Sequence, residues 1–567
     1  MKNNYLKLLI SGLLLVLAFP PFPFPFLIWI AGVPLLEVLF SIPSESSSSK
    51  EPNKWNLFLR KISFQPLWKK GWKTNLVKGI KPYKKAFRYS YFTFFIWNLG
   101  ACYWLALTAW HVPTDEAFSS FLAGLVAVLL NPLFMSIPIL IWAMLFPRLP
   151  IWLKGICLIV FWIGFEFLHY NWDLSWSWLT LGNSFTNFPE FLQYAEFTGV
   201  LGVSLWILVL NAFAYSVWVG IKSRRVKGLS IIAFLLIACL PLGLNYWILD
   251  ANREVFQSSA SMNVRVIQPN IDPYVKFDHD GLEAQLTGFY QLADAPGADT
   301  IDLVVLPETA IPEAVWTHEI STSELFKGFW TLVAKYPQLS ILTGFTELRQ
   351  FDSPDVSSAS RPFDNGYYDY CNSAVIIGSS QFHTHQKGWL VPMVERIPFL
   401  DQLSFLKDYN IDIGGGLGSY GKSDSAKALF TRKGVPVGVL ICYESAFGNY
   451  AREYPLLGAS LLTVITNDGW WGRSSGYIQH AGLSVLRAIE NRRCVARSAN
   501  TGISLFVDEK GNRFKEVEWG IAKAIDKKLP LFTHITLYAQ YGDYIGKIAV
   551  MIGLLFWVLG ILKRRNK

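Results

Sequence analysis

The chain has 567 residues, of which 52% are hydrophobic, 16% aromatic and only 16% charged, with a formal net charge of +9. This composition excludes an ordinary soluble globular protein and predicts a chain that is largely embedded in a membrane. The positive charge is concentrated in residues 44–88, where twelve Lys or Arg stand against Glu45 and Glu51, so it indicates membrane topology and requires no nucleic acid partner.

Eight apolar runs predict membrane spans, most of them long enough for the roughly 20 residues that a bilayer-crossing helix needs. They cover residues 5–19, 24–42, 89–111, 118–146, 150–168, 194–220, 228–249 and 546–563. The first run is short and precedes PPFPFPF (residues 20–26), which predicts a tight hairpin between the first two spans. A cleaved signal peptide is the rival interpretation of residues 1–19, but that segment lacks a clear small-residue cleavage site.

The basic residues predict the orientation, because Lys and Arg that flank spans stay cytoplasmic. With a cytoplasmic N-terminus, every basic cluster falls on the cytoplasmic side. These clusters are residues 44–88, Arg148 with Lys154, residues 222–227 and residues 563–567. The acidic loop with Asp115 and Glu116 falls outside, as does everything from about residue 250 to 545.

These signals divide the chain into three parts. We expect transmembrane helices in residues 1–250, a large polar domain outside the membrane in residues 251–545, and a last span with a basic cytoplasmic tail in residues 546–567. Both termini are therefore expected in the cytoplasm.

Two segments of the first part have unusual compositions. Residues 44–54 form a Ser-rich, charged linker, and the basic residues that follow are expected to lie along the inner leaflet. The outward loop 169–190 carries Trp172, Trp176 and Trp178. Such residues usually mark the membrane interface, and the alternative is that they line a lipid entrance beneath the outer domain.

From Asn263 onward, short apolar runs alternate with longer segments. The strand-like runs lie within residues 264–270, 302–312, 339–345, 373–378, 435–445, 461–468 and 503–508, and helix-like segments cover 280–294 and 320–336. This pattern predicts an α/β domain with helices packed against β-sheet. Glu308, Lys387 and Cys442 each lie at or just after the end of a strand-like run, where α/β folds place their sites.

Cys442 ends the buried run and is the candidate nucleophile. A thiol attacks a carbonyl as thiolate and therefore needs a base or a cation nearby. Glu308 can accept the proton, while Lys387 and the backbone N–H of Tyr443 can stabilise an oxyanion. Taken singly, Cys442 could be a buried small hydrophobe, Glu308 a helix cap and Lys387 a solvated charge. Together they predict an acyl-transfer site.

The remaining Cys and His residues give weaker signals. Outside the predicted spans lie Cys371, Cys442 and Cys494, an odd number that leaves at least one thiol unpaired. The closest His pair, His383 and His385, has no Cys or Asp ligand set beside it. We therefore expect no metal and no cofactor.

Four motifs carry a family resemblance. They are PETAIP (307–312), K-x-x-LVP-x-x-E (387–395), CYES (442–445) and TNDGWWG…QH…R-x-x-E…RSANTG (466–502). The set resembles the nitrilase-type domain of the apolipoprotein N-acyltransferase family, whose plan of about eight spans and an outward catalytic domain is also similar. Soluble nitrilases share the Glu-Lys-Cys set but not the spans. The resemblance implies a multi-span α-helical membrane bundle plus an extracytoplasmic α/β nitrilase-like domain, an α-β-β-α sandwich. It also implies a bacterial inner membrane, with residues 251–545 as the periplasmic catalytic domain.

The resemblance also implies roles for individual residues. Glu308 would be the general base, Lys387 the oxyanion stabiliser and Cys442 the nucleophile. Supporting residues around the Lys and the Cys would be Glu395, Tyr443 and Glu444.

Three Trp residues are candidate lipid contacts. Trp470 and Trp471 lie in the segment 469–472, an apolar arm with a glycine at each end that could dip toward lipid as a lid. The alternative is an aromatic loop that packs on the domain. Trp178 of the outward loop is the third candidate.

The reaction that the resemblance implies has two halves in a ping-pong order. Cys442 takes an acyl chain from a membrane phospholipid as a thioester, and the α-amine of an apolipoprotein's N-terminal diacylglyceryl-cysteine then receives it as an amide. The implied partners are the phospholipid donor, the modified apolipoprotein and the bilayer, with the chain itself a monomer.

Two other functions stay open on the sequence alone. One is a membrane-tethered nitrilase-type amidase that acts on a small amide with the same three residues. The other is a transporter or membrane scaffold whose outer domain only binds. That function predicts ionisable residues within the spans, and the candidates are chiefly Glu37 and Glu166.

Overall fold

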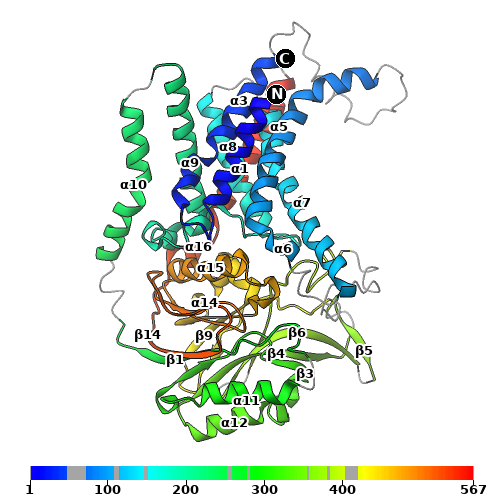
Figure 1. The fold of residues 1–567 in the computed structure, drawn as a ribbon, viewed down its shortest axis with the longest axis vertical. Coiled ribbons are helices and arrows are strands. Elements are labelled where there is room, and N and C mark those ends of the chain that lie inside the picture. Colours follow the sequence, from blue (N-terminus) through cyan, green and yellow to red (C-terminus); the bar gives the residue numbers. More distant parts are fainter. Residues whose placement is uncertain are drawn as a thin grey trace.

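The computed structural model joins a bundle of helices to a mixed α/β part, with the two stacked along the longest axis of the molecule (Figure 1). The structure describes residues 2–46, 72–107, 114–145, 151–225, 228–251, 258–277, 281–353, 357–364, 366–379, 383–402 and 419–565. Residues 47–71, which include most of the predicted linker, lie outside the described residues.

The bundle contains the helices of the N-terminal half together with the last helix of the chain. They are α1 (Lys2–Leu17), α2 (Ile28–Ala31), α3 (Val33–Ser46), α5 (Trp72–Cys102), α6 (Trp104–Leu107), α7 (Thr114–Leu145), α8 (Ile151–Tyr170), α9 (Ala195–Lys222), α10 (Gly228–Ala251) and α17 (Tyr544–Arg565). The predicted turn after the first run is present, because α1 ends at Leu17 and α3 packs back against it.

Five helical segments in the described part of the chain are long and apolar enough to cross a membrane. They are Pro25–Ile42, Ser120–Leu145, Leu153–Tyr170, Ala195–Lys222 and Gly228–Asp250. Two shorter apolar helices, Asn3–Leu17 and Tyr544–Leu559, coincide with the first and last predicted runs. The count of eight spans and their orientation stay predictions.

The α/β part contains two sheets. The first has the order β14-β1-β2-β4-β6-β5, with β3 beside β4 and β7 beside β6. Its strands are β1 (Ser261–Gln268), β2 (Leu303–Val305), β3 (Ile311–Trp316), β4 (Ser340–Phe351), β5 (Arg361–Phe363), β6 (Gly366–Ile377), β7 (Thr384–Gln386) and β14 (Lys523–Pro530).

The second sheet has the order β13-β12-β11-β10-β9-β8. Its strands are β8 (Leu429–Phe430), β9 (Pro436–Ile441), β10 (Leu461–Thr466), β11 (Cys494–Ala499), β12 (Ser504–Val507) and β13 (Arg513–Val517). The central strands β9, β10 and β11 run parallel, so their carboxyl ends meet at one edge of the sheet.

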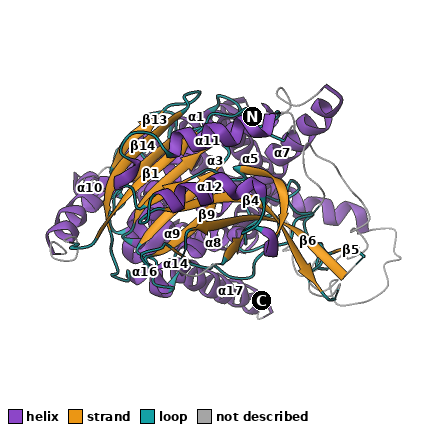
Figure 2. Ribbon diagram, turned by 90° about the horizontal axis from the view of Figure 1, so that it is seen from below, coloured by secondary structure: helices purple, strands orange, loops and turns teal. Residues whose placement is uncertain are grey.

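The sheets stack face to face between two layers of helices. Strand β2 is buried on both faces in this arrangement. Its residues Leu303 and Val305 pack toward the second sheet, while Val304 packs toward the helices on the other side. A strand buried on both faces reads as a continuous apolar run. Helices α11 (Leu282–Ala293) and α12 (Glu324–Lys335) lie across the outer face of the first sheet (Figure 2).

On the opposite side, α15 (Ser475–Asn491) lies where the second sheet meets the bundle (Figure 1). Nearly all of its residues are buried, and it packs against α9 as well as β11 and β12. Short helices α13 (Gly448–Ala451), α14 (Glu453–Leu456) and α16 (Leu537–Tyr541) complete this layer. The order is thus the α-β-β-α sandwich that the resemblance implies.

Candidate active site

Glu308 lies just after β2 and its carboxylate is held by three donors. Oε1 accepts from Asn372 Nδ2 at 2.7 Å and from Lys387 Nζ at 3.1 Å. Oε2 accepts from the backbone N–H of Asn467 at 3.1 Å. The residue is only 7% exposed, so the carboxylate is fixed in direction and shielded from bulk water.

Lys387 follows β7 and is 1% exposed. Its Nζ lies 3.1 Å from Glu308 Oε1 and 2.8 Å from Glu395 Oε1. Burial alone would lower the pKa of the Lys387 ammonium, but the charges of Glu308 and Glu395 raise it well above its ordinary value. Lys387 is therefore a permanent cation between two carboxylates.

Glu395 is anchored to the loop that carries it. Its Oε2 accepts from the backbone N–H of Val391 at 2.7 Å, and its Oε1 also accepts from Asn372 Nδ2 at 3.2 Å. Asn372 thus bridges the Glu308 and Glu395 carboxylates, and Lys387 also donates to both.

Cys442 follows β9 and opens the 3-10 turn Cys442–Ala446. Its φ is +50°, in the left-handed region that non-glycine residues seldom adopt. The Cys442 carbonyl accepts a hydrogen bond from Ser445 Oγ at 2.7 Å and lies 3.1 Å from His480 Nε2. These contacts hold a strained turn that presents the thiol at the end of the strand.

The Cys442 thiol shares its surroundings with the base and the lysine. Burial raises the pKa of Cys442 above its ordinary value; the Glu308 charge raises it further, and Lys387 opposes the shift. The structure therefore brings the three predicted residues together, with the thiol protonated near neutral pH. Such a thiol needs a base before it can attack.

A buried network of charged residues lies behind Cys442, and the sequence does not predict it. His480 Nδ1 lies 2.7 Å from Asp468 Oδ1, and Arg497 Nη2 donates to Asp468 Oδ2 at 2.7 Å. Burial would raise the pKa of Asp468, but Arg497 and His480 lower it. Burial also lowers the pKa of His480. The TND, QH and RSAN motifs contain these residues, and their spacing alone does not reveal the contact with Cys442.

Glu444 connects the lysine and cysteine loops through backbone groups. Its Oε1 accepts from the N–H of Gly388 at 2.6 Å and its Oε2 from the N–H of Ile441 at 2.7 Å. Gly388 follows Lys387 and Ile441 precedes Cys442, so the buried Glu444 carboxylate fixes the separation of the two loops.

Tyr443 connects the nucleophile loop to the bundle. Its hydroxyl donates to the carbonyl of Ser175 at 2.6 Å, in the loop that joins α8 to α9. Its ring makes an edge contact with Phe447 at 4.9 Å between centroids. The predicted pocket residue therefore also holds the α8–α9 loop against the site.

The three candidate lipid-contacting Trp residues lie in different surroundings. Trp178 is 3% exposed and donates from Nε1 to Gln479 Oε1 at 2.8 Å, so the structure places it in the interior. Trp471 packs against Trp178 at 5.5 Å. Trp470 packs against Tyr274 at 5.2 Å. In this structure the segment 469–472 is packed on its surroundings, as the alternative to a lid predicts.

Lys276 is a second buried lysine beside the base, and nothing in the sequence pattern marks it. Its Nζ donates to the Glu308 carbonyl at 2.8 Å and to Thr309 Oγ1 at 2.9 Å. Thr309 has a φ of +43°, so Lys276 braces a strained turn directly after the base. Burial lowers the pKa of Lys276 to about 7, although Glu308 opposes this shift.

Comparisons with known proteins agree with both parts of this architecture. Residues 74–213 match the family model described as apolipoprotein N-acyltransferase N-terminal domain, and residues 263–531 match the one described as carbon-nitrogen hydrolase. The second match spans nearly all of both sheets.

Relatives match over almost the whole chain. The apolipoprotein N-acyltransferase of Chlorobaculum tepidum is 30% identical, covering 98% of this chain and 96% of its own. That of Geobacter metallireducens is 26% identical, covering 96% and 92%. Among solved structures, Saccharomyces cerevisiae Nit3 of the nitrilase superfamily matches with 17% identity and a TM-score of 0.33, over 48% of this chain and 91% of that chain.

Proposed function

Since this chain belongs to the apolipoprotein N-acyltransferase family, we propose that it N-acylates the N-terminal diacylglyceryl-cysteine of apolipoproteins with a chain from a membrane phospholipid. The chain is an acyltransferase with a nitrilase-like domain and apolar membrane helices. The single observation that carries the proposal is the buried group of Glu308, Lys387 and Cys442 beside a bundle of apolar helices.

In the first half-reaction, Cys442 Sγ attacks the ester carbonyl of a phospholipid while Glu308 accepts the thiol proton. The negative charge that develops on the carbonyl oxygen is stabilised by the Lys387 ammonium and the backbone N–H of Tyr443. The ester C–O bond then breaks, and the departing lysophospholipid oxygen takes the proton from Glu308. The product on the enzyme is a Cys442 thioester.

In the second half-reaction, the α-amine of the diacylglyceryl-cysteine attacks the thioester carbonyl. Glu308 accepts a proton from the attacking nitrogen, and the same two donors stabilise the oxyanion. The C–S bond breaks, the Cys442 sulfur recovers the proton, and an amide is released. Water must stay out while the thioester exists, and the 8% exposure of Cys442 supports this requirement.

The supporting residues act through the three central ones. Glu395 holds the Lys387 ammonium at 2.8 Å and keeps it charged. Glu444 sets the distance between the lysine and cysteine loops, and Tyr443 contributes its backbone N–H while its hydroxyl is held by the bundle.

The proposal includes a place for each part of the chain. Residues 1–250 and 546–567 would lie in a bacterial inner membrane with both termini cytoplasmic, and residues 251–545 would face the periplasm. The apolar helices and the basic clusters of residues 222–227 and 563–567 support this arrangement. The protein would act as a monomer on lipids held in the bilayer.

The experiment that tests the proposal follows the acyl chain. Purified protein in vesicles that contain a phospholipid with radiolabelled acyl chains is quenched in acid and analysed by mass spectrometry. We expect the label on Cys442, and none in Cys442→Ala. The matched control is Cys494→Ala, which removes another buried thiol of the same domain and should leave the label in place.

The second half-reaction separates a transferase from an amidase. A diacylglyceryl peptide with a free N-terminal amine should discharge the label into an amide, while the same peptide with an acetylated amine should not. A protein that never acquires label, yet hydrolyses a small amide, would overturn the proposal in favour of the amidase.

A further inference from the structure

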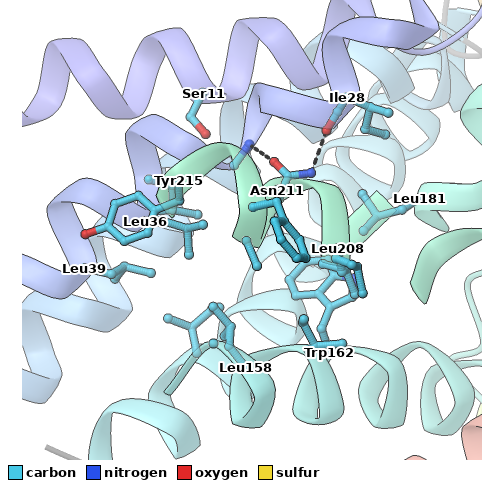
Figure 3. Close-up of a pocket in the computed structure, with 18 of the residues that line it drawn as sticks. Ser11, Ile28, Leu36, Leu39, Leu158, Trp162, Leu181, Leu208, Asn211 and Tyr215 are labelled. Atoms are coloured by element: carbon cyan, nitrogen blue, oxygen red, sulfur yellow. Dashed lines mark hydrogen bonds between the residues drawn. The ribbon is translucent and has the colours of Figure 1, made fainter. Parts of the chain in front are cut away.

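A cavity of about 480 Å3 lies within the helix bundle (Figure 3). Helices α3, α5, α7, α8 and α9 pack pairwise into a ring around it, and α1 contributes one side. Among its described lining residues there is no member of the Glu308, Lys387 and Cys442 group. The cavity is therefore a separate feature.

The lining of the cavity is overwhelmingly apolar. Leu, Ile, Val, Phe and Trp side chains from these helices line it, among them Leu36, Leu39, Leu158, Trp162 and Leu208 (Figure 3). A surface of this kind offers nothing to recognise a charged or strongly polar ligand.

The polar side chains at its centre are already occupied by the protein. Asn211 Oδ1 accepts from the backbone N–H of Gly32 at 2.7 Å, and Asn211 Nδ2 donates to the carbonyl of Ile28 at 2.7 Å (Figure 3). Ser11 Oγ donates to the carbonyl of Ala31. These hydrogen bonds satisfy backbone groups at the break between α2 and α3.

The surroundings of the cavity identify what fills it. Its walls include helices that are long and apolar enough to cross a membrane, so bilayer hydrocarbon is the solvent outside. Ile156 of α8 and Phe213 of α9 line the cavity and are also 44% and 37% exposed. The cavity is therefore open to the surrounding hydrocarbon, and a chain that enters it gains dispersion contacts with apolar side chains that would otherwise be unmade.

We propose that this cavity binds one hydrocarbon chain of a bilayer phospholipid, at a site distinct from the acyl-transfer site. The volume lies within the range of about 300–1,000 Å3 that is typical of small-molecule sites. A chain bound there completes the packing of the bundle that supports the catalytic domain. The proposal does not depend on the acyl-transfer chemistry.

Gly155 of α8 provides a way to close the site without strain. It lines the cavity, and a Cβ added there would meet no atom of the described chain within 4 Å. The series Gly155→Ala, Gly155→Leu and Gly155→Phe therefore fills the cavity in steps. Gly243 of α10 is equally open by the same measure and is not among the lining residues, so Gly243→Leu is the matched control.

The test uses the full chain with Cys442→Ala in vesicles of phosphatidylcholine. A small fraction of that lipid carries a diazirine on one acyl chain, and labelled residues are mapped by mass spectrometry after irradiation. We expect labels on cavity residues such as Leu39 and Leu208, reduced about tenfold by Gly155→Leu and unchanged by Gly243→Leu. Leu236 of α10, 67% exposed, should be labelled equally in every variant and reports a folded, lipid-embedded protein.

Two results would overturn the proposal. One is labelling of Leu236 with no label on the cavity residues, or cavity labels that do not change across the Gly155 series. The other is labelling of the cavity by a water-soluble diazirine, which would show that it holds water. Because the assay runs on Cys442→Ala, its failure is distinguishable from a failure of the acyl-transfer proposal.

Discussion

At the scale of single residues, the fold keeps the candidate nucleophile protonated. Burial and the charge of Glu308 raise the pKa of the Cys442 thiol. Because the thiolate is the reactive form, we expect iodoacetamide to modify Cys442 slowly at pH 7, with a rate that rises about tenfold per pH unit below that pKa. Mass spectrometry of the alkylated peptide at pH 7, 8 and 9 measures this, with Cys442→Ala as the blank.

Glu308→Gln gives this prediction a distinctive control. The substitution removes a negative charge that raises the pKa of Cys442, so the thiolate fraction at a given pH increases. We expect Glu308→Gln to be alkylated faster than the unsubstituted protein although it transfers no acyl chain. Fast and pH-independent alkylation of the unsubstituted protein would contradict a protonated resting thiol.

Lys276 predicts a pH-dependent stability. Burial lowers its pKa to about 7 in the folded protein, whereas an unfolded lysine titrates near 10.4. Between these values the unfolded state binds more protons, so stability rises with pH by up to about 1.4 kcal/mol per unit. We expect Lys276→Met to flatten this rise when unfolding in detergent is followed from pH 7.5 to 9.5.

The control for this effect is a lysine on the surface. Lys327 lies on the exposed face of α12, with its side chain 70% exposed, so Lys327→Met should keep the pH profile of the unsubstituted protein. Parallel profiles for Lys276→Met and the unsubstituted protein would show that Lys276 carries an ordinary charge in the folded state.

Sequence reasoning selects some of these residues and misses others for a physical reason. Glu308, Lys387 and Cys442 each end a strand-like run, and that local signal is readable in one dimension. Lys276 acts on the Glu308 backbone from 32 residues away, and His480 reaches Cys442 from 38. Such contacts depend on how the loops fold over each other, and no local pattern encodes them.

At the scale of elements, apolar runs predict where helices lie but not where they begin and end. Of the predicted run 89–111, residues 89–102 lie in α5 and residues 104–107 in α6. Helix α5 begins at Trp72 and so extends through basic residues that no hydropathy signal includes. The predicted run 24–42 is divided between α2 and α3. The helix-like segments 280–294 and 320–336 agree closely with α11 and α12, because their amphipathic faces pack on the sheet.

Glu166 shows what a charged residue does inside such an element. Its Oε1 accepts from Trp162 Nε1 at 3.0 Å and from the backbone N–H of Leu181 at 3.1 Å. The carboxylate thus joins α8 to the segment before α9, a structural task that sequence alone does not separate from transport. We expect Glu166→Leu to lower the free energy of unfolding by about 1–3 kcal/mol, because two buried donors lose their acceptor.

Glu166→Gln distinguishes this structural role from a role of the charge. The amide oxygen can accept the same two hydrogen bonds, so thermal unfolding of Glu166→Gln in detergent should stay close to that of the unsubstituted protein. Equal destabilisation by Gln and Leu would mean that the negative charge, rather than the acceptor, is what α8 requires.

At the scale of the whole molecule, the bundle and the α/β part share a core. One continuous set of buried residues includes Trp97 and Leu201 of the bundle together with Leu462 and Leu486 of the α/β part. The family identification made from four motifs is confirmed by relatives that match along almost the full chain. The motifs could not show how the bundle and the α/β part join at α9 and α15. The contacts of this joint pair segments about 300 residues apart.

Arg492 makes two of these long-range contacts. At the end of α15, its guanidinium donates to Glu196 Oε2 at 2.5 Å and to Gln193 Oε1 at 2.7 Å, and all three residues are buried. Removing one partner of a buried ion pair costs about 3–5 kcal/mol. We therefore expect Arg492→Ala to lower the unfolding temperature in detergent strongly, and to open the joint between α15 and α9 to limited proteolysis.

Two further variants decide whether the lower stability of Arg492→Ala comes from the broken joint or from the loss of any charge. Arg492→Lys keeps the charge but cannot reach both partners with a planar fork, so its stability should fall between those of the unsubstituted protein and Arg492→Ala. Arg513→Ala breaks a bridge to Glu516, which is 42% exposed, and should cost at most about 1 kcal/mol. If Arg492→Ala were no more harmful than Arg513→Ala, the α/β part would not depend on the bundle for its stability. Acyl transfer would then require the bundle only to hold lipid.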